Sequence, residues 1–413
     1  MSATPLSTTV LGRRRAVAVF LVFAFAYFFS ALLRAITATL APVFKGELGL
    51  DAAQLGLLAG AYFLGFSAMQ LPLGHLLDRH GPKRTTIGLL AVAVVGCAGF
   101  AVARDMGQLL LARSIIGVGV SACLMAPLTL FRRCFDEATQ LRANSWMLMT
   151  GSIGMLASTL PVQWMLPSVG WRGMFAAAAV LLALSIVLVA STAPADSTHS
   201  PAGHGTGQGY AAVFRSTAFR SLAPIGFFGY GGLIAMQSLW IGPWLTVVGG
   251  RTAGEAATGL FVVNASMLLA FLCWGWAMPR LVKTGWSAAR LIRCIWPLSV
   301  ACMALLIWRA AEAGPAHWAV WCVLTSVVTL SQPAVGQAFA VHLAGRALSA
   351  FNLVIFFGVF AVQWGLGLLI DAFARAGWSP SDAHCMAMVV YLATCMVSAV
   401  PVYRTTPLWA ARR

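Results

Sequence analysis

One arginine of this chain stands inside a long apolar run, where a charge calls for a chemical purpose. Arg34 is the only charged residue of segment 16–43. A charge in the middle of a membrane helix costs at least about 2.5–3.5 kcal/mol, so such residues usually face an internal cavity. A guanidinium fits carboxylate and phosphate groups through its planar fork of N–H donors. We therefore expect Arg34 to bind an anion; the alternative is a structural arginine bonded to backbone carbonyls.

A second group with possible chemistry is the charged segment 74–84, which reads GHLLDRHGPKR between two apolar runs. An aspartate near a helix end is attracted to the partial positive charge at the N-terminus of an opposing helix, and Asp78 could make that contact. The basic residues beside it could pair with acids of the neighbouring loop, namely Arg79, Lys83 and Arg84 with Asp136 or Glu137. Such contacts would hold the neighbouring helices together in one conformation. The simpler alternative is charge that only sets membrane topology.

Polar residues also interrupt the apolar runs of the second half. Gln237 and Trp240 lie in GYGGLIAMQSLWIGPWL, and their spacing of three places them on one face of a helix. Asn352 and Gln363 interrupt a later run. We predict that these four residues line a substrate site together with Arg34. Each of the amides could equally hold two helices together.

The composition requires that lipid cover much of the chain. Of its 413 residues, 60% are hydrophobic and 9% are charged, whereas soluble proteins carry about 25% charged residues. A membrane helix needs about 20 apolar residues, and the apolar runs predict an all-α integral membrane protein with twelve such helices. Their limits are 16–43, 52–77, 85–103, 107–131, 144–167, 171–192, 221–247, 256–279, 288–308, 316–343, 347–374 and 383–403.

The net charge of +16 could indicate a nucleic-acid partner, but membrane topology explains it better. With both termini in the cytoplasm, most Lys and Arg residues outside the helices fall on the cytoplasmic side. The residues on the opposite side are Lys45, Arg104, Arg172, Arg251, Arg309 and Arg375. This bias is typical of membrane proteins. We expect a monomer in the cytoplasmic (inner) membrane whose partners are lipid and a small solute, with no nucleic acid.

Segment 191–209 divides the chain into halves of similar length. It is rich in Ser, Gly, Pro and Thr, a composition typical of a flexible linker. We predict an N-terminal six-helix bundle over 1–190, a cytoplasmic linker over 191–219 and a C-terminal six-helix bundle over 220–413. Residues 275–285 repeat the glycines and an arginine of 74–84, with Pro279 in place of the aspartate. Repeated bundles of this kind place a substrate site between them, near the middle of the bilayer.

Taken together, these motifs resemble the major facilitator superfamily. Segment 74–84 is similar to the family signature G-x-L-x-D-R-x-G-x-K/R-R between transmembrane helices 2 and 3, at Gly74, Leu76, Asp78, Arg79, Gly81, Lys83 and Arg84. The patterns Arg113-x-x-x-Gly117-x-Gly119 and Gly170-Trp171-Arg172-x-x-Phe175 are similar to family motifs of spans 4 and 6. The resemblance covers the whole chain. It implies two pseudo-symmetric six-helix bundles, transport by alternating access without a cofactor or metal, and a conformational role for segment 74–84 and Arg113.

The resemblance also bears on the solute. Arg34 followed by Pro42 is similar to the first helix of organophosphate exchangers in the superfamily, which carry a second arginine in the seventh helix. The corresponding residue here is Ala235, so a monoanion such as a monocarboxylate fits better than a phosphate ester. Of the eleven acids, Asp371 comes closest to the middle of a predicted helix. Since proton-coupled carriers commonly use a buried carboxylate, we expect another route: substrate exchange, an ion held by backbone oxygens, or His342.

Our leading hypothesis is a secondary transporter of a small organic anion, and several alternatives remain open. Drug efflux is less favoured because the fifth span, MTGSIGMLASTLP, lacks the Gly-Pro pair common in family drug antiporters. Copper import is disfavoured because spans 7 and 8 carry no M-x-x-x-M or H-x-x-x-M pair. An enzyme is disfavoured because the chain lacks G-x-S-x-G, H-E-x-x-H and a phosphate loop. A sensor on the same fold is a further alternative, since fold does not dictate function.

Overall fold

The computed structural model describes residues 11–196 and 209–404, and within them it contains helices and loops but no strand. The α-helices of the first half are α1 (Arg13–Leu48), α2 (Ala52–Ala68), α3 (Gln70–Val102), α4 (Met106–Gly119), α5 (Ala122–Cys134), α6 (Glu137–Ala157) and α7 (Leu160–Thr192). Those of the second half are α8 (Tyr210–Arg215), α9 (Thr217–Ile225), α10 (Gly231–Ala235), α11 (Ile241–Pro243), α12 (Ala253–Lys283), α13 (Ala288–Arg309), α14 (Pro315–Thr325), α15 (Ser331–Gln337), α16 (Val341–Arg375) and α17 (Pro380–Arg404). Short π-helical segments are η1 (Gly226–Tyr230), η2 (Met236–Trp240) and η3 (Trp244–Val248), and 3₁₀ segments are η4 (Ala310–Glu312) and η5 (Ser326–Leu330).

The helices have the length that a bilayer demands. In the described part of the chain, ten helical segments are long and apolar enough to cross a membrane, and the shorter α2 is also apolar. Two of the long helices are broken by a glycine with positive φ, α3 at Gly81 (80°) and α7 at Gly170 (66°). These breaks are consistent with the twelve predicted crossings, although the exact number stays a prediction.

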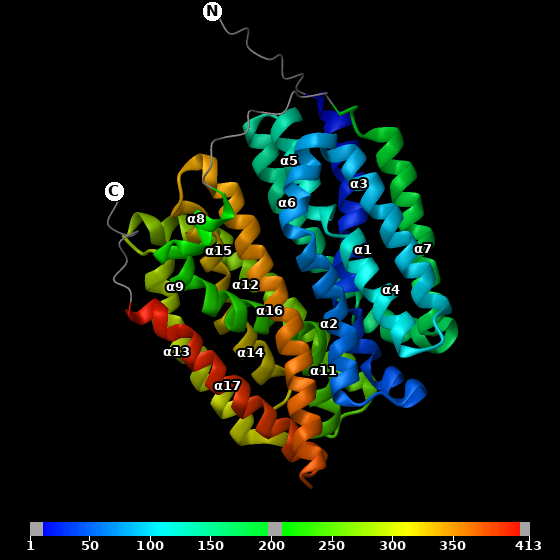
Figure 1. The fold of residues 1–413 in the computed structure, drawn as a ribbon, viewed down its shortest axis with the longest axis vertical. Helices are drawn as coiled ribbons and strands as arrows, with labels where there is room; N and C mark the ends of the chain where they lie inside the picture. Colours follow the sequence, from blue (N-terminus) through cyan, green and yellow to red (C-terminus); the bar gives the residue numbers. More distant parts are fainter. Residues whose placement is uncertain (1–10, 197–208, 405–413) are drawn as a thin grey trace, which may run out of the picture.

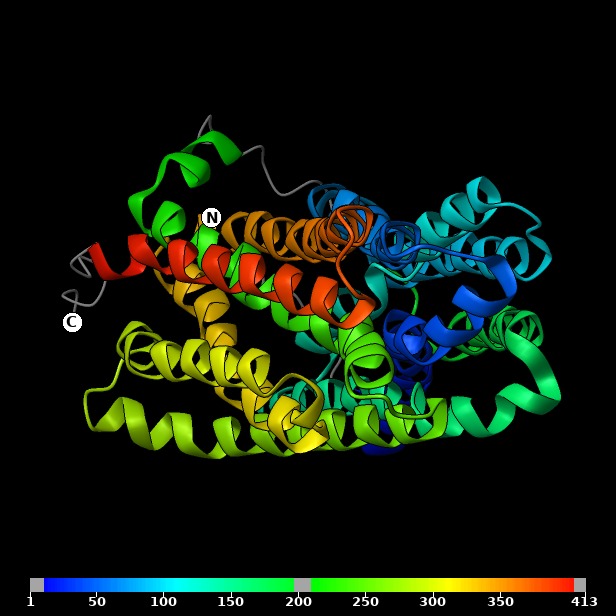
Figure 2. The ribbon, with the colours of Figure 1, turned by 90° about the horizontal axis from the view of Figure 1, so that it is seen from below.

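The two halves of the chain form two helical bundles that lie side by side (Figures 1 and 2). Helices α1 to α7 occupy one side of the molecule in Figure 1, and α9 to α17 occupy the other. The predicted all-helical membrane fold of two bundles is confirmed. The predicted domain limits are not tested, and residues 197–208 of the predicted linker lie outside the described residues.

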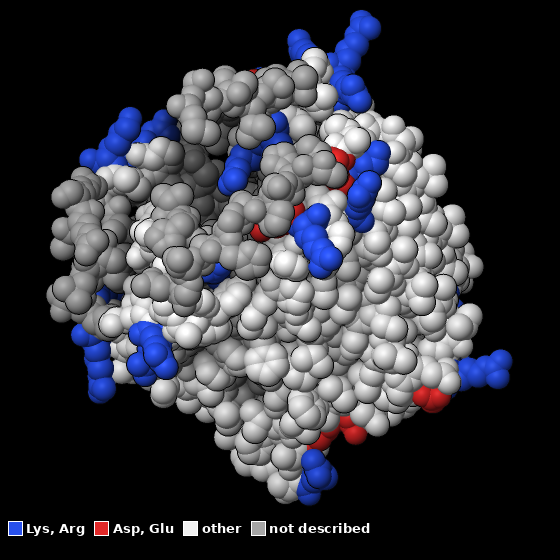
Figure 3. Space-filling view, turned by 45° about the horizontal axis from the view of Figure 1, so that its top comes forward, with Lys and Arg blue, Asp and Glu red and all other residues white. Residues whose placement is uncertain are grey.

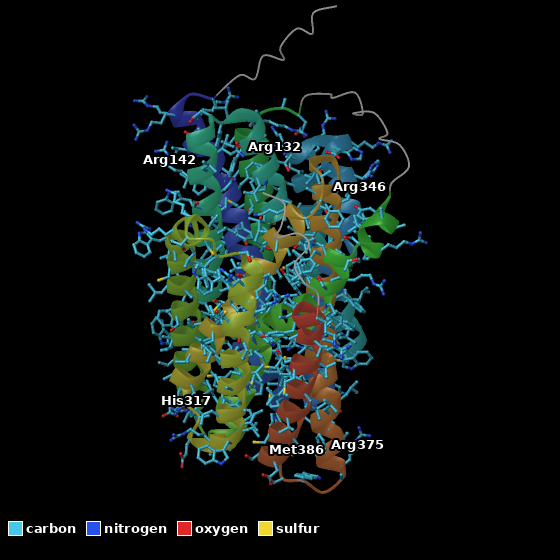
Figure 4. All side chains as sticks on the ribbon, turned by 90° about the vertical axis from the view of Figure 1, so that its left-hand side faces the viewer. Arg132, Arg142, His317, Arg346, Arg375 and Met386 are labelled. Atoms are coloured by element: carbon cyan, nitrogen blue, oxygen red, sulfur yellow. The ribbon has the colours of Figure 1, made fainter. Side chains whose placement is uncertain are left out.

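Charged side chains gather at the two ends of the helices. Arg132, Arg142 and Arg346 lie at the end of the molecule where α1 begins, which we call the termini end (Figure 4). Arg375 lies at the opposite end, called the far end here. Figure 3 shows Lys and Arg around the termini end and a wide uncharged surface between the two ends. This is the distribution that a lipid-covered belt requires.

The two bundles meet closely along α2 and α16, which run side by side in both ribbon views. A side chain at Gly56 of α2 would collide with the backbone carbonyl oxygen of Gln363 in α16. Glycine therefore permits the two backbones to approach each other here. At the far end of this seam, the Asp371 carboxylate accepts hydrogen bonds from the backbone N–H groups of Ala52 (3.1 Å) and Ala53 (2.7 Å). The seam is thus fixed by close packing along its length and by a carboxylate at its end.

Segment Thr217–Val248, which contains several glycines and Pro243, is an irregular helix. The α-helical turns alternate with the π-helical segments η1, η2 and η3. Such π turns are rare and frequently occur at functional sites. Tyr230 lies in η1, whereas Gln237 and Trp240 lie in η2.

Candidate substrate site

Arg34 lies on α1 where the two bundles meet. Its guanidinium carbon is 5.6 Å from the ring centre of Phe66 in α2 and 5.8 Å from that of Phe356 in α16. The two rings are themselves 4.5 Å apart and inclined at 60°. The predicted cation therefore contacts both halves of the protein, in the place where the repeated bundles were expected to form a site.

Within the described residues, no carboxylate forms an ion pair with Arg34. The ion pair found there is between Arg309 and Glu312 on the surface. The Nε atom of Arg34 is buried without a hydrogen-bond partner. The polar groups that interact with its charge include the hydroxyls of Tyr27, Tyr62 and Tyr230 and the Cys123 thiol. A cation that is partly buried and has no anionic partner is expensive, so the site is suited to an anion supplied from outside.

Arg113 of α4 is a second cation among apolar residues, and it is fully buried inside the first bundle. Its Nη2 atom donates to the backbone carbonyl of Leu33 (2.8 Å) and to the Thr37 hydroxyl (2.6 Å) on α1. Its guanidinium also lies 5.1 Å from the ring centre of Tyr62. Arg113 therefore links α4 to the stretch of α1 that carries Arg34, as expected of a residue that packs and couples helices. Its conformational role is not tested.

The polar candidates of the second half are largely bonded to one another. Trp240 donates from Nε1 to the backbone carbonyl of Gln363 (3.2 Å), and the Gln363 amide donates to the Ser238 hydroxyl (2.9 Å). Asn352 accepts from the Gln332 amide (2.6 Å). These contacts bring Trp240 and Gln363 together and place Asn352 in a different pair. In the structure these residues hold neighbouring helical segments together. Their role in substrate binding stays a prediction.

Gln237 is the remaining candidate. Its side chain is buried in η2, and no hydrogen bond of that side chain is seen among the described residues. It therefore stays a prediction for the site. The side chain of His342 lies outside the described residues.

The charged segment 74–84 is organised by an acid that the sequence did not single out. Asp196, which follows α7, accepts from the backbone N–H groups of Lys83 (3.0 Å) and Arg84 (2.8 Å). Lys83 also donates from Nζ to the Ala193 carbonyl (2.7 Å). Gly81 is required here, because its φ is +80° and a side chain on it would collide with Asp196. The beginning of the predicted linker is thus fixed to this segment.

The expected pairing of the basic residues with Asp136 is wrong for this conformation. Asp136 caps α6 by accepting from the backbone N–H of Thr139 (3.0 Å), and hydrogen bonding to Thr139 lowers the pKa of its carboxyl. The carboxylate is therefore used within its own loop. Asp78 and Arg79 are exposed, so Asp78 does not cap an opposing helix in this arrangement. The side chain of Glu137 lies outside the described residues.

Two cavities lie elsewhere. A groove of about 600 Å³ between α13 and α17 is almost wholly apolar and contains none of the predicted site residues. A cavity of about 50 Å³ at the far end is bounded by Lys45, Asp51, Trp240 and His384. The second is much smaller than the roughly 300–1,000 Å³ of ordinary ligand sites. Neither replaces Arg34 as the centre of the candidate site.

The sequence pattern of the Major Facilitator Superfamily matches residues 23–363, which include Arg34, segment 74–84 and the seam between the bundles. The chain belongs to the Major Facilitator Superfamily. The resemblance noted from the motifs is therefore confirmed. Membership of the superfamily, together with the long apolar helices, indicates a multi-pass membrane protein.

Known proteins similar to parts of this chain transport organic acids. The 4-hydroxybenzoate transporter PcaK of Pseudomonas putida is 31% identical over 155 residues, which cover 36% of this chain and 34% of that protein. The galacturonate transporter of Dickeya chrysanthemi is 27% identical over 147 residues, or 35% of this chain and 42% of that protein. These matches span only about a third to two fifths of the relatives.

The fold is similar to solved superfamily structures over nearly the whole chain. A bacterial homologue of the human lysosomal transporter Spinster, solved in an inward-facing and unoccupied conformation, matches with a TM-score of 0.74 at 17% identity. The match covers 95% of this chain and 97% of that structure. At this identity the similarity concerns the fold alone.

Proposed function

We propose that the protein is a secondary transporter that carries a small organic anion by alternating access, with Arg34 binding the carboxylate. The observation that carries this proposal is the position of Arg34, which lies between the two bundles without an acidic partner in the described residues. Rocking of one bundle against the other would expose this residue to each side in turn. The relatives add support, because 4-hydroxybenzoate and galacturonate are both carboxylates.

The distribution of charge supports a location in the cytoplasmic (inner) membrane with both termini in the cytoplasm. The arginines of the termini end then lie on the cytoplasmic side, as the positive-inside bias requires. Segment 74–84 lies on the same side. We assign Gly74, Asp78, Arg79, Gly81, Lys83 and Arg84 to the conformational change, because Asp196 and the helix break at Gly81 organise this loop through contacts that do not involve Arg34.

The experiment compares the wild type with Arg34→Ala and Arg34→Lys. Thermal unfolding of the purified protein is recorded with benzoate, galacturonate, tetraphenylphosphonium and Cu⁺, since a ligand of the folded state raises the apparent stability. We expect at least one carboxylate to stabilise the wild type. Arg34→Ala should abolish the shift, and Arg34→Lys should weaken it because an ammonium lacks the planar fork.

Arg309→Lys is the matched control, because it makes the same replacement at an exposed ion pair. It should respond to the carboxylates as the wild type does. Stabilisation by the phosphonium cation or by Cu⁺ alone would instead favour the efflux or the copper alternative. An unchanged carboxylate response in Arg34→Ala would contradict the proposed role of Arg34.

A further inference from the structure

The surroundings of Arg34 are aromatic on both sides of the bundle interface. Phe66 and Phe356 present their rings to the guanidinium from α2 and α16. Phe63 extends this surface, with its ring stacked 6.4 Å from that of Phe356. Neither ring carries a hydrogen-bonding group, so neither occupies the N–H donors of the guanidinium. The cation can therefore receive a carboxylate at its edge while flat apolar surfaces lie beside it.

Most of the polar groups that interact with this cation in the described residues are phenols, and the Cys123 thiol is a further one. Tyr27, Tyr62 and Tyr230 supply phenolic hydroxyls, and that of Tyr62 also donates to the Ser30 carbonyl (3.2 Å). The amides that might bind a polyhydroxylated solute are partly engaged, because Gln363 donates to Ser238 and Asn352 accepts from Gln332. The Oε1 atom of Gln363 and the side chain of Gln237 are left for a solute. A sugar acid carries more hydroxyls than these few groups can pair, and each unpaired hydroxyl is penalised.

We infer that the solute is an aromatic monocarboxylate with few hydroxyl groups, such as a benzoate. This inference rests on the proposed function and adds to it the chemical class of the solute. The carboxylate pairs with the Arg34 edge, and the ring packs against Phe66 and Phe356. A single ring hydroxyl can pair with one of the tyrosines. Phe66 and Phe356 are then the residues that determine specificity.

The test measures equilibrium binding of radiolabelled 4-hydroxybenzoate to the purified full-length protein in lipid nanodiscs. Binding is preferred to uptake because the neutral form of a benzoic acid crosses bilayers unaided. Benzoate, cyclohexanecarboxylate and galacturonate serve as competitors. Benzoate and cyclohexanecarboxylate share charge and size, so the ratio of their affinities isolates the effect of aromaticity.

Aromatic pairs contribute about 0.5–1.5 kcal/mol beyond buried area, so benzoate should compete roughly 2- to 12-fold better than cyclohexanecarboxylate. Galacturonate should compete at least about 100-fold more weakly than benzoate.

The variants Phe66→Leu and Phe356→Leu keep an apolar side chain but remove the ring. Each should bring the ratio of benzoate to cyclohexanecarboxylate towards one. Phe271→Leu, at a side chain of α12 that is 41% exposed, should leave the ratio unchanged. A ratio of two affinities does not change when a variant is generally less stable. If a variant does not fold, the ratio measured for the wild type still decides whether the site prefers an aromatic ring.

Two failures are distinguishable. If galacturonate competes as well as benzoate, or if the wild type does not distinguish benzoate from cyclohexanecarboxylate, the aromatic class is wrong while an anion site at Arg34 still stands. If no carboxylate binds the wild type, or if all bind Arg34→Ala equally well, the proposed function itself fails.

Discussion

Asp371 joins the two bundles through backbone hydrogen bonds, and its removal should loosen the far end of the seam. Both carboxylate oxygens accept from the first turn of α2, at 3.1 and 2.7 Å. A hydrogen bond to a charged group contributes about 1.5–3 kcal/mol, and the helix N-terminus adds about 0.3–1 kcal/mol. Because Asp371 is only partly buried, solvent screens the interaction. We therefore expect Asp371→Ala to remove about 2 kcal/mol in total.

That energy belongs to the arrangement in which the far end is closed. A loss of about 2 kcal/mol changes the ratio of closed to open molecules roughly 30-fold, since about 1.4 kcal/mol corresponds to a factor of ten. Spin labels at Arg104 and Ala376, both exposed at the far end of different bundles, would report the change by pulsed electron paramagnetic resonance. A background without the nine cysteines is needed for labelling. The variant should show a new population at longer distance.

Asp382→Ala is the matched control. Its carboxylate also accepts near a helix N-terminus at the far end, from the Ser379 hydroxyl (2.6 Å), but within a single bundle. It should leave the distance distribution unchanged. If Asp371→Ala and the control give the same distribution as the parent, the contact contributes too little to hold the bundles together, and the reasoning above is refuted.

Three further predictions concern packing and the termini end. Gly56→Ala should destabilise the protein by about 1–3 kcal/mol, because the new methyl group overpacks the seam; thermal unfolding checks this against Gly88→Ala, where a side chain meets open space. Asp196→Ala should speed tryptic cleavage after Lys83 severalfold, since two backbone N–H groups lose their acceptor; unchanged digestion would speak against the anchoring of the linker. Asp78→Asn should slow solute exchange in proteoliposomes more than it weakens equilibrium binding, and the reverse order would place Asp78 in the binding site instead.

The features that could be predicted from the sequence are those that lipid imposes. Apolar runs must become helices because a bilayer leaves no other partner for backbone groups, so the helical fold followed from composition. Arg34 was identifiable because a charge among apolar residues has few explanations. Segment 74–84 was identifiable from its motif, and its separation from the binding residues followed from its place between spans.

The contacts that could not be predicted depend on how separate helices meet. Phe66 and Phe356 are two aromatic residues in a chain that is 11% aromatic, and nothing in their local sequence distinguishes them. The partners of Gln363 and Asn352 lie on other turns or helices, so their use could not be derived from spacing. Asp136 was misassigned because long-range pairing was considered and local capping was not, although an aspartate directly before a helix commonly caps it.

The contact at Asp371 has one further consequence, because its partners are peptide groups. The side chains at positions 52 and 53 take no part in these hydrogen bonds, so an inspection of side-chain pairs across the seam would miss the interaction. Proline is the exception, since it has no N–H. Ala52 is the first residue of α2, where proline suits the helix geometry, and Asp51 before it is already extended (φ −74°, ψ 176°). Ala52→Pro would thus remove one of the two N–H groups that donate to Asp371 without disturbing the start of α2. The link between the bundles would then depend on the N–H group of Ala53 alone, while every side chain around it is retained.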